Sequence, residues 1–305
     1  DIHENRPGNQ LRDQAYELGD VDGGFASADL VSEGAFSSTE VIHMQLERNA
    51  ALADYDSNRG RLTLQSVSQV PYYLHLSLAQ CLDMDMSRIH IIKPFVGGGF
   101  GARAQALNFE IIAAMLAKAA GGKVRVEQSR EDCFLSHRGR PQSELKIKLG
   151  LKKDGEITGC SAEIIQAGGA YSSYGIITIL YAGAAINGLY KMPAFRYQGN
   201  RVFTNLPACG AMRGHGTVAT RFAFETLMSE MAEELGLDPF EVRRKNLLTV
   251  PCETINGVKI NSYGLPECLD WVEIASGWKD RFGKLPPKGR MRRGLGMGCS
   301  HMLSG

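Results

Sequence analysis

The chain has 305 residues, of which 44% are hydrophobic and 22% charged, a composition typical of one large globular domain or two. A net charge of +1 provides no field to attract nucleic acid or an anionic membrane, and no apolar run is long enough to span a bilayer. Seven dispersed cysteines without a C-x-x-C pair indicate reduced thiols in a cytoplasmic protein, and exclude a zinc or iron–sulfur site by spacing.

The N-terminal residues 1–19 are polar and contain a Pro-Gly-Asn-Gln run, which predicts an extended linker arm. Residues 20–305 contain both the helical and the strand pattern of apolar residues, so we expect a single α+β domain with mixed sheets and flanking helices. Helices are predicted at residues 23–28, 71–82, 103–119, 218–235, 240–248 and 266–274. Strands are predicted at residues 31–36, 61–68, 89–95, 123–127, 143–151, 156–166 and 195–205, with hairpin turns at 55–60 and 152–155.

Two segments of the sequence predict contacts with other parts of the protein. Glu47 lies inside the apolar stretch 41–53, where a carboxylate needs a partner unless it lies on the surface of a bent strand. Residues 293–303 resemble the start of a buried strand. We therefore expect a piece of a longer polypeptide, inactive by itself, with part of its site in a later half.

The most distinctive segment is the loop 96–102, which follows a predicted strand and precedes a predicted helix. Gly98, Gly99 and Gly101 uncover backbone N–H groups, and the N-terminus of the next helix favours an anion such as phosphate. Phe100 offers a flat packing surface inside this bare loop. A tight crossing of two backbones without a ligand is the competing, less favoured explanation.

A dinucleotide site is an alternative interpretation of the same loop. Gly97, Gly99 and Ala102 fit G-x-G-x-x-A, and Glu127 ends a later predicted strand. The hairpins predicted further along the chain do not continue a Rossmann pattern, so NAD binding is the less favoured interpretation of this loop.

Further candidates flank two other junctions. Gln69 lies between a predicted strand and a helix, where active-site groups often project, although a cap or turn role is slightly favoured. In the small-residue loop 207–216, Arg213 precedes a helix and suits an oxyanion or phosphate clamp, with a structural salt bridge as the alternative. Tyr171, Tyr174 and Tyr181 lie near glycines and alanines, where core packing and a pocket wall are equally favoured.

Taken together, Gln69, the loop 97–101, residues 211–214 and the helical region 233–246 resemble, in order and spacing, the large subunits of the xanthine oxidase family of molybdenum hydroxylases. The resemblance covers nearly the whole chain. Within this family the chain is similar to the 4-hydroxybenzoyl-CoA reductases, in segments that lie at residues 63–75, 92–101, 137–141, 166–181 and 209–217.

This resemblance implies a molybdenum ion held by a pterin dithiolene, as molybdopterin cytosine dinucleotide, with no metal ligand from the protein. It also implies partner subunits that carry iron–sulfur clusters and FAD, and ferredoxin as electron donor. Gln69 would hydrogen-bond an oxo ligand of molybdenum. The implied cofactor-binding residues are Gln69, Gly98, Gly99, Phe100, Gly101, Ala211, Met212, Arg213 and Gly214.

The expected substrate follows from departures from the family pattern. Purine-oxidising relatives carry a glutamate where this chain has Ala104, and an arginine near Leu180 and Tyr181, where it has none. We therefore expect reductive dehydroxylation of an aromatic CoA thioester, 4-hydroxybenzoyl-CoA, to benzoyl-CoA, with Tyr174 and Tyr181 as catalytic residues at the ring. Hydroxylation of another aromatic, heterocyclic or aldehyde substrate, or a non-catalytic structural module, remains an alternative.

Overall fold

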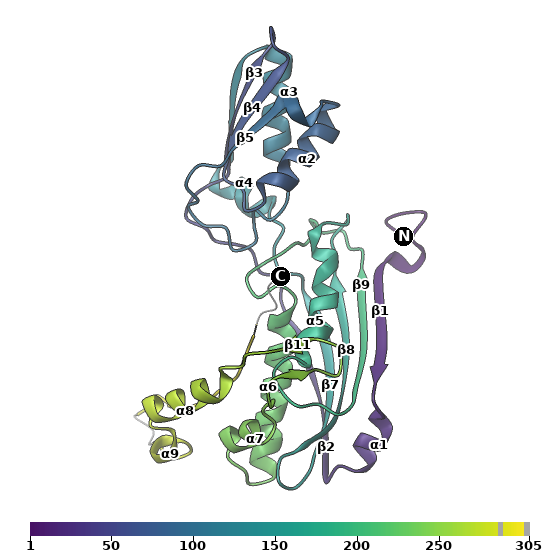
Figure 1. The fold of residues 1–305 in the computed structure, drawn as a ribbon, viewed down its shortest axis with the longest axis vertical. Coiled ribbons are helices and arrows are strands. Elements are labelled where there is room, and N and C mark those ends of the chain that lie inside the picture. The colour runs from purple at the N-terminus through teal and green to yellow at the C-terminus, as the bar shows by residue number, and fades with distance from the viewer. Residues whose placement is uncertain (286–288, 302–305) are drawn as a thin grey trace.

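The computed structural model describes residues 1–285 and 289–301 and divides them between two lobes, each built on its own β-sheet (Figure 1). The smaller lobe, residues 50–127, is inserted between two neighbouring strands of the larger sheet. This confirms the expected mixed fold, although the residues expected as one domain form two lobes.

The larger lobe contains a five-stranded sheet with the order β1-β9-β8-β7-β2. Its strands are β1 (Gln10–Leu18), β2 (Leu30–Ser38), β7 (Ser143–Leu151), β8 (Ile157–Ala167) and β9 (Phe195–Val202). β8 and β9 run parallel, because helix α5 lies in the connection between them, and all other neighbours are antiparallel.

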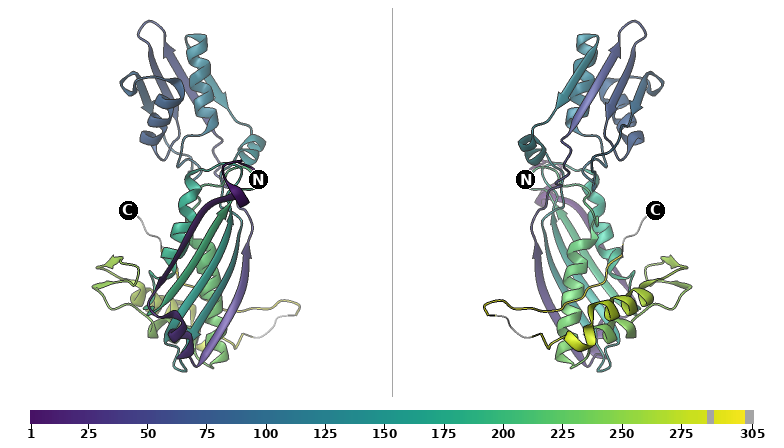
Figure 2. Two further views of the ribbon diagram at one scale, coloured as in Figure 1. Left: turned by 90° about the vertical axis from the view of Figure 1, so that its right-hand side faces the viewer. Right: turned by 90° about the vertical axis from the view of Figure 1, so that its left-hand side faces the viewer.

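Helices α5 (Thr178–Ile186) and α6 (Thr217–Glu234) pack against each other and against one face of this sheet (Figure 2). Their apolar side chains, among them Ile179 and Phe224, join those of β7 and β8 in the larger core. The remaining elements of this lobe are α1 (Val21–Ala26), α7 (Pro239–Lys245), β10 (Cys252–Glu253), β11 (Lys259–Ile260), α8 (Leu265–Ser276) and α9 (Trp278–Arg281).

The smaller lobe is a four-stranded sheet, in the order β5-β4-β3-β6, that packs against two helices. Its elements are β3 (Ala50–Asp56), β4 (Arg61–Ser66), α2 (Pro71–Leu82), β5 (Ile89–Ile92), α3 (Asn108–Ala120) and β6 (Lys123–Glu127), and α4 (Arg130–Leu135) follows. Its core combines Leu62 and Leu64 of the sheet with Leu74 and Leu78 of α2 and the alanine face of α3. None of the helices in the described ranges has the length and hydrophobicity to cross a membrane.

The second half of the stretch expected as a linker arm is strand β1, which pairs with β9 along its length. Leu11 is buried, and the ring of Tyr16 lies 5.3 Å from that of Tyr197. An edge strand of a sheet with one covered face needs few apolar residues, so its polar composition was misleading.

The helix expected from residue 103 begins instead at Asn108. Arg103 is 2% exposed, and its side chain turns into the interior, which prevents the helix from starting there. The glycine loop therefore does not lead directly into a helix N-terminus. That N-terminus is capped by the chain itself, since Glu110 Oε2 accepts a hydrogen bond from Leu107 N at 2.8 Å.

The dinucleotide alternative is not supported by the geometry of the smaller lobe. β5 and β6 lie at opposite edges of the sheet, separated by β4 and β3, and β6 is antiparallel to its neighbour β3. A dinucleotide-binding unit requires parallel strands joined through the glycine turn and its helix.

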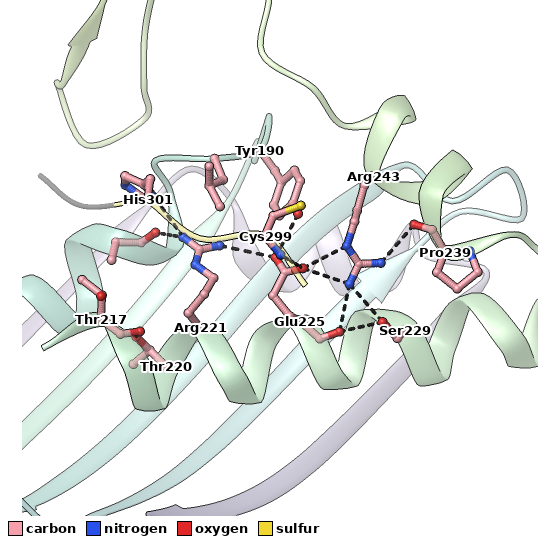
Figure 3. A network of polar contacts seen from close by, with 12 residues as sticks. Tyr190, Thr217, Thr220, Arg221, Glu225, Ser229, Pro239, Arg243, Cys299 and His301 are labelled. Atoms are coloured by element: carbon pink, nitrogen blue, oxygen red, sulfur yellow. Dashed lines mark hydrogen bonds and ion pairs between the residues drawn. The ribbon is translucent and has the colours of Figure 1, made fainter. Parts of the chain in front are cut away.

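Residues 293–301 form no strand, so the prediction of one at 293–303 is wrong over this range, and residues 302 and 303 lie outside the described residues. Cys299 is nevertheless buried, and its N–H donates to Glu225 Oε2 at 2.9 Å (Figure 3). Contacts with side chains of the larger core, and no pairing with a strand, thus hold the described part of a segment whose pattern suggests a sheet.

Candidate cofactor site

Residues from both lobes line an open cavity of about 930 Å³. The predicted site residues that line it are Gln69, Phe100, Gly101, Tyr174, Tyr181, Ala211, Met212, Arg213 and Gly214. Other lining residues are Ala104, Arg140, His215, Thr217, Val218, Ser300 and His301. The predicted residues from separate parts of the chain are thus brought together, whereas Gly98 and Gly99 are not part of the lining.

Gln69 is fixed by its own amide oxygen. Oε1 accepts hydrogen bonds from Gly101 N at 2.9 Å and Arg103 N at 3.3 Å. This assigns the amide orientation, so Nε2 remains as a donor with no acceptor among the described residues. Val70 is the N-cap of α2 and no side chain caps it, so the interpretation of Gln69 as a helix cap is wrong.

The glycine loop crosses other protein segments at very short range. A Cβ at Gly99 would lie 2.6 Å from Gln69 Oε1, and one at Gly101 would lie 2.5 Å from Ala211 O. Phe100 adopts φ 53°, and its carbonyl accepts a hydrogen bond from Arg213 N at 2.8 Å. The crossing of two backbones, the less favoured explanation of these glycines, is therefore real and joins the two predicted loops.

Some donors of the loop stay free despite this crossing. The N–H of Gly97 donates to Glu47 Oε2, and that of Gly101 donates to Gln69. Those of Gly98, Gly99 and Phe100 have no protein acceptor within the described part of the chain. Successive backbone donors of this kind suit an anion or a polar ring edge.

A buried arginine that sequence reasoning missed holds the loop in place. Arg103 Nη1 lies 2.5 Å from Glu47 Oε2 and donates to Gly98 O at 3.1 Å. This is the partner that Glu47 was expected to need. The pairing spans 56 positions, so neither periodicity nor spacing could have revealed it.

The second loop is positioned through its carbonyl groups. His43 Nε2 lies 2.7 Å from Ala211 O, and Arg140 Nη2 donates to Arg213 O at 2.6 Å. Burial lowers the pKa of His43, so a neutral ring with its proton on Nε2 donates to this carbonyl. The exposed guanidinium of Arg213 forms no ion pair within residues 1–285 and 289–301, so the expected alternative, a structural salt bridge, is absent there.

An aromatic group that includes a histidine completes the wall. The ring centroid of His215 lies 5.5 Å from that of Tyr174 and 5.6 Å from that of Tyr181. Tyr171 lies outside the cavity, where its ring is 5.3 Å from that of His3. Sequence reasoning did not single out His215, whose only signal was a histidine between two glycines of the Arg213 loop.

This donor set fits an anionic cofactor with a flat ring system. It offers Nε2 of Gln69, the backbone N–H of Phe100, and the charge of Arg213, none of them paired within the part of the chain that the structure describes. No three His, Cys, Asp or Glu side chains gather to hold a metal ion in the part of the chain that the structure describes. A metal bound here would need ligands from its own cofactor.

Comparisons with known proteins agree with this donor set. The family described as "Molybdopterin cofactor-binding domain" matches residues 2–247. The xanthine dehydrogenase molybdenum-binding subunit of Escherichia coli O157:H7 is 33% identical over 294 residues, which cover 96% of this chain and 39% of that protein. The nicotinate dehydrogenase large molybdopterin subunit of Eubacterium barkeri is 34% identical over 255 residues, 83% of this chain and 60% of that protein.

Among solved structures, quinoline 2-oxidoreductase from Pseudomonas putida 86 superposes with a TM-score of 0.84 at 28% identity, over 91% of this chain and 36% of that one. The chain spans well under half the length of the xanthine dehydrogenase subunit. None of these three is named for 4-hydroxybenzoyl-CoA, so they do not support the narrower resemblance. The chain is similar to the molybdenum-binding and molybdopterin subunits of these dehydrogenases, and it belongs to the molybdopterin cofactor-binding domain family.

Proposed function

We propose that this chain forms one part of the molybdopterin site in a molybdenum hydroxylase that oxidises an aromatic heterocycle or an aldehyde. One observation carries the proposal. Gln69, Phe100 with Gly101, and the Arg213 loop, which lie far apart in sequence, line one cavity. Nε2 of Gln69, the N–H of Phe100 and the guanidinium of Arg213 have no protein partner there among the described residues. The relatives named for xanthine and nicotinate, and the structure named for quinoline, support a heterocycle as the substrate class.

The residues of this chain would bind the cofactor in two ways. The free N–H group of Phe100, together with Nε2 of Gln69, would donate to polar atoms at the metal end. Arg213 would bind an anionic group, either on the pterin or on its phosphate, and we assign the cytosine dinucleotide form on resemblance alone. When bound, the cofactor supplies two-electron redox chemistry and exchanges oxygen with the substrate.

The protein's own contribution is orientation. Arg103 and Glu47 fix the glycine loop, while His43 and Arg140 fix the carbonyls of the Arg213 loop. These contacts hold both loops before a ligand arrives, which lowers the entropic cost of aligning cofactor and substrate. Tyr174 and Tyr181 offer flat apolar surface with hydroxyl groups for a substrate ring.

The complete enzyme would require partners for its electrons. We propose an iron–sulfur subunit and a flavin subunit with FAD, as the resemblance implies, and ferredoxin only if the reaction runs reductively. Oxidation of a substrate and reduction of one would both take place in this cavity, and the two reactions differ in the direction of electron flow.

Reductive dehydroxylation of 4-hydroxybenzoyl-CoA is the second candidate. The observation that favours it is the small apolar Ala104 in the cavity wall, where a purine-binding carboxylate would lie in relatives that oxidise purines. A phenol ring needs apolar contact and one or two hydroxyl partners, which Tyr174 and Tyr181 provide.

The test is the molybdenum and nucleotide content of the complete enzyme that contains this chain, with an Arg213→Lys variant. Replacing a planar, bidentate fork by a point charge weakens cofactor retention, so we expect molybdenum content to fall several-fold. Arg61→Lys, at an exposed position on β4, is the matched control and keeps full content. Full retention in Arg213→Lys, or wild-type enzyme without molybdenum and cytosine nucleotide, contradicts the proposal.

A substrate panel separates the two candidates. Oxidation of quinoline, nicotinate, xanthine or benzaldehyde with an artificial acceptor supports the hydroxylase. Reduction of 4-hydroxybenzoyl-CoA with a low-potential donor, without any of these oxidations, would favour the reductase instead.

A further inference from the structure

His215 is a buried polar side chain that the protein leaves without a partner. It is 8% exposed, and neither Nδ1 nor Nε2 has a hydrogen-bond partner among the described residues. Either neutral tautomer has one N–H donor and one acceptor nitrogen, so both functions go unused. Leaving a buried polar group unsatisfied costs stability, and such groups in native proteins call for an explanation.

The surroundings of His215 keep its ring neutral. Burial, together with the positive charge of Arg201, lowers the pKa of His215 to about 4. Arg201 itself is fully buried and donates to Thr178 Oγ1 at 2.7 Å and to Cys209 O at 3.1 Å, so its position is fixed. A neutral imidazole can donate one hydrogen bond and accept another. It is therefore a better partner for an uncharged polar atom of a ligand than for a charged group.

The protein interior offers His215 little beyond its aromatic neighbours. A small hollow behind the ring has a volume of about 10 Å³, enough for at most one water molecule. Two polar groups that line this hollow, Gln166 and Thr178, already hydrogen-bond each other at 2.8 Å. On its other side the ring borders the large cavity, between Tyr174 and Tyr181.

We propose that His215 determines substrate specificity by forming a hydrogen bond between its neutral ring and a heteroatom of an aromatic substrate that lies beside Tyr174 and Tyr181. The inference rests on the proposed function and assigns it a substrate class: flat rings with a polar atom at the edge. Rings of the same shape without that atom leave His215 unsatisfied and bind more weakly. His215 acts on binding and makes no bond that changes during the reaction.

The test compares pairs of ligands that differ in one ring atom. Quinoline is paired with naphthalene, and nicotinate with benzoate, because each pair exchanges a ring nitrogen for C–H at nearly constant shape. Dissociation constants are measured by calorimetry on the complete enzyme, reduced beforehand with dithionite so that no ligand is turned over. Molybdenum content and thermal unfolding are measured on every preparation.

We expect the wild-type enzyme to bind the nitrogen-containing member of at least one pair about tenfold or more tightly, which corresponds to a typical hydrogen bond. In His215→Phe this ratio falls close to one, through weaker binding of the heterocycle. His215→Gln, which restores a donor and an acceptor, recovers part of the ratio. If the Phe variant does not fold, His215→Leu provides the same comparison.

Three results overturn the inference. They are a wild-type ratio near one for both pairs, an unchanged ratio in the apolar variants, and a loss of molybdenum in those variants, which would place His215 against the cofactor. An unchanged ratio in a fully molybdenum-loaded enzyme refutes only the role of His215. A wild-type enzyme without molybdenum refutes the proposed function itself.

Discussion

Two buried polar groups at helix α6 differ in whether the protein provides them with hydrogen-bond partners. Inside the helix, Glu225 is 5% exposed and pairs with the fully buried Arg243 of α7 at 2.9 Å (Figure 3). Just before the helix, His215 is equally buried and has no partner among the described residues. The difference separates a polar group that holds the fold from one that is left available to a ligand.

The Glu225–Arg243 pair is saturated with hydrogen bonds. Glu225 also accepts from Tyr190 OH and from Cys299 N, each at 2.9 Å. Every guanidinium nitrogen of Arg243 donates, with Pro239 O and Ser229 Oγ as further acceptors. Buried ion pairs stabilise only when their remaining donors and acceptors are satisfied, and this pair meets that condition.

The cavity groups lack this saturation. Gln69 keeps one free amide donor, Arg213 lacks a carboxylate among the described residues, and His215 uses neither nitrogen. Gln69 and Arg213 are exposed to solvent, whereas the unsatisfied His215 is buried and costs stability, as expected where function opposes stability. Substitutions in the Glu225–Arg243 pair should therefore lower the stability of the fold, whereas substitutions of the cavity groups should change ligand binding or turnover.

The largest effect is expected for Glu225→Gln. Besides Arg243, the buried Arg221 pairs with Glu225, at 3.8 Å. The change keeps the side chain's shape but leaves both arginines as buried charges without this carboxylate. Breaking a buried pair in this way costs about 3–5 kcal/mol of unfolding free energy. Urea unfolding measures it, with Glu241→Gln as control, because that carboxylate is 61% exposed and pairs with Arg244 only at 3.7 Å. A loss below 1 kcal/mol for Glu225→Gln would show that the pair is not structural.

Gln69→Ala should leave the fold and the molybdenum content intact but slow turnover of the complete enzyme. Removing one oriented donor at a reacting centre costs about 3 kcal/mol of transition-state stabilisation, roughly a hundredfold in rate. Gln65→Ala, on the exposed face of β4, is the control. Unchanged turnover at full molybdenum loading would assign Gln69 only to loop packing.

His215 should also make the chain sensitive to acid. Its pKa lies at about 4 in the folded chain, below the ordinary 6.5, so the unfolded chain takes up the proton first as the pH falls. Stability from this group is complete above pH 6.5 and decreases toward pH 4, by about 2 kcal/mol at pH 5. His301 also has a pKa lowered to about 4, so His215→Phe should reduce, not abolish, the decrease in unfolding free energy between pH 7 and pH 5, whereas His90→Phe, at an exposed position, should leave it unchanged. Equal pH dependence in both variants would mean that His215 is solvated.

The smallest effect concerns the tyrosine hydroxyls. Tyr174→Phe and Tyr181→Phe remove a hydroxyl with little change in volume, and we expect at least one to lower kcat/KM about tenfold. Tyr171→Phe is the matched control because that ring lies outside the cavity. Normal kinetics in both cavity variants would reduce Tyr174 and Tyr181 to apolar wall.

The sequence predicted local structure correctly where residues close together in the chain determine it. Helix α2 has the predicted bounds, because Pro71 fixes its first turn. Asp238 caps α7, with Oδ1 accepting from Phe240 N at 2.7 Å, and the hairpin between β7 and β8 forms as the turn at 152–155 predicted. The motifs around Gln69, Phe100 and Arg213 also indicated the family, and the structure brings them into one cavity.

The tertiary structure alone decided how those motifs are held and what stays unpaired. Arg103 with Glu47, and His43 with Ala211, are contacts between segments whose spacing carries no signal. The pairing of β1 depends on a partner strand that follows much later in the chain. The unpaired donor and acceptor of the His215 ring are likewise a property of the assembled fold. The ring becomes buried without a partner among the described residues only when distant segments pack around it.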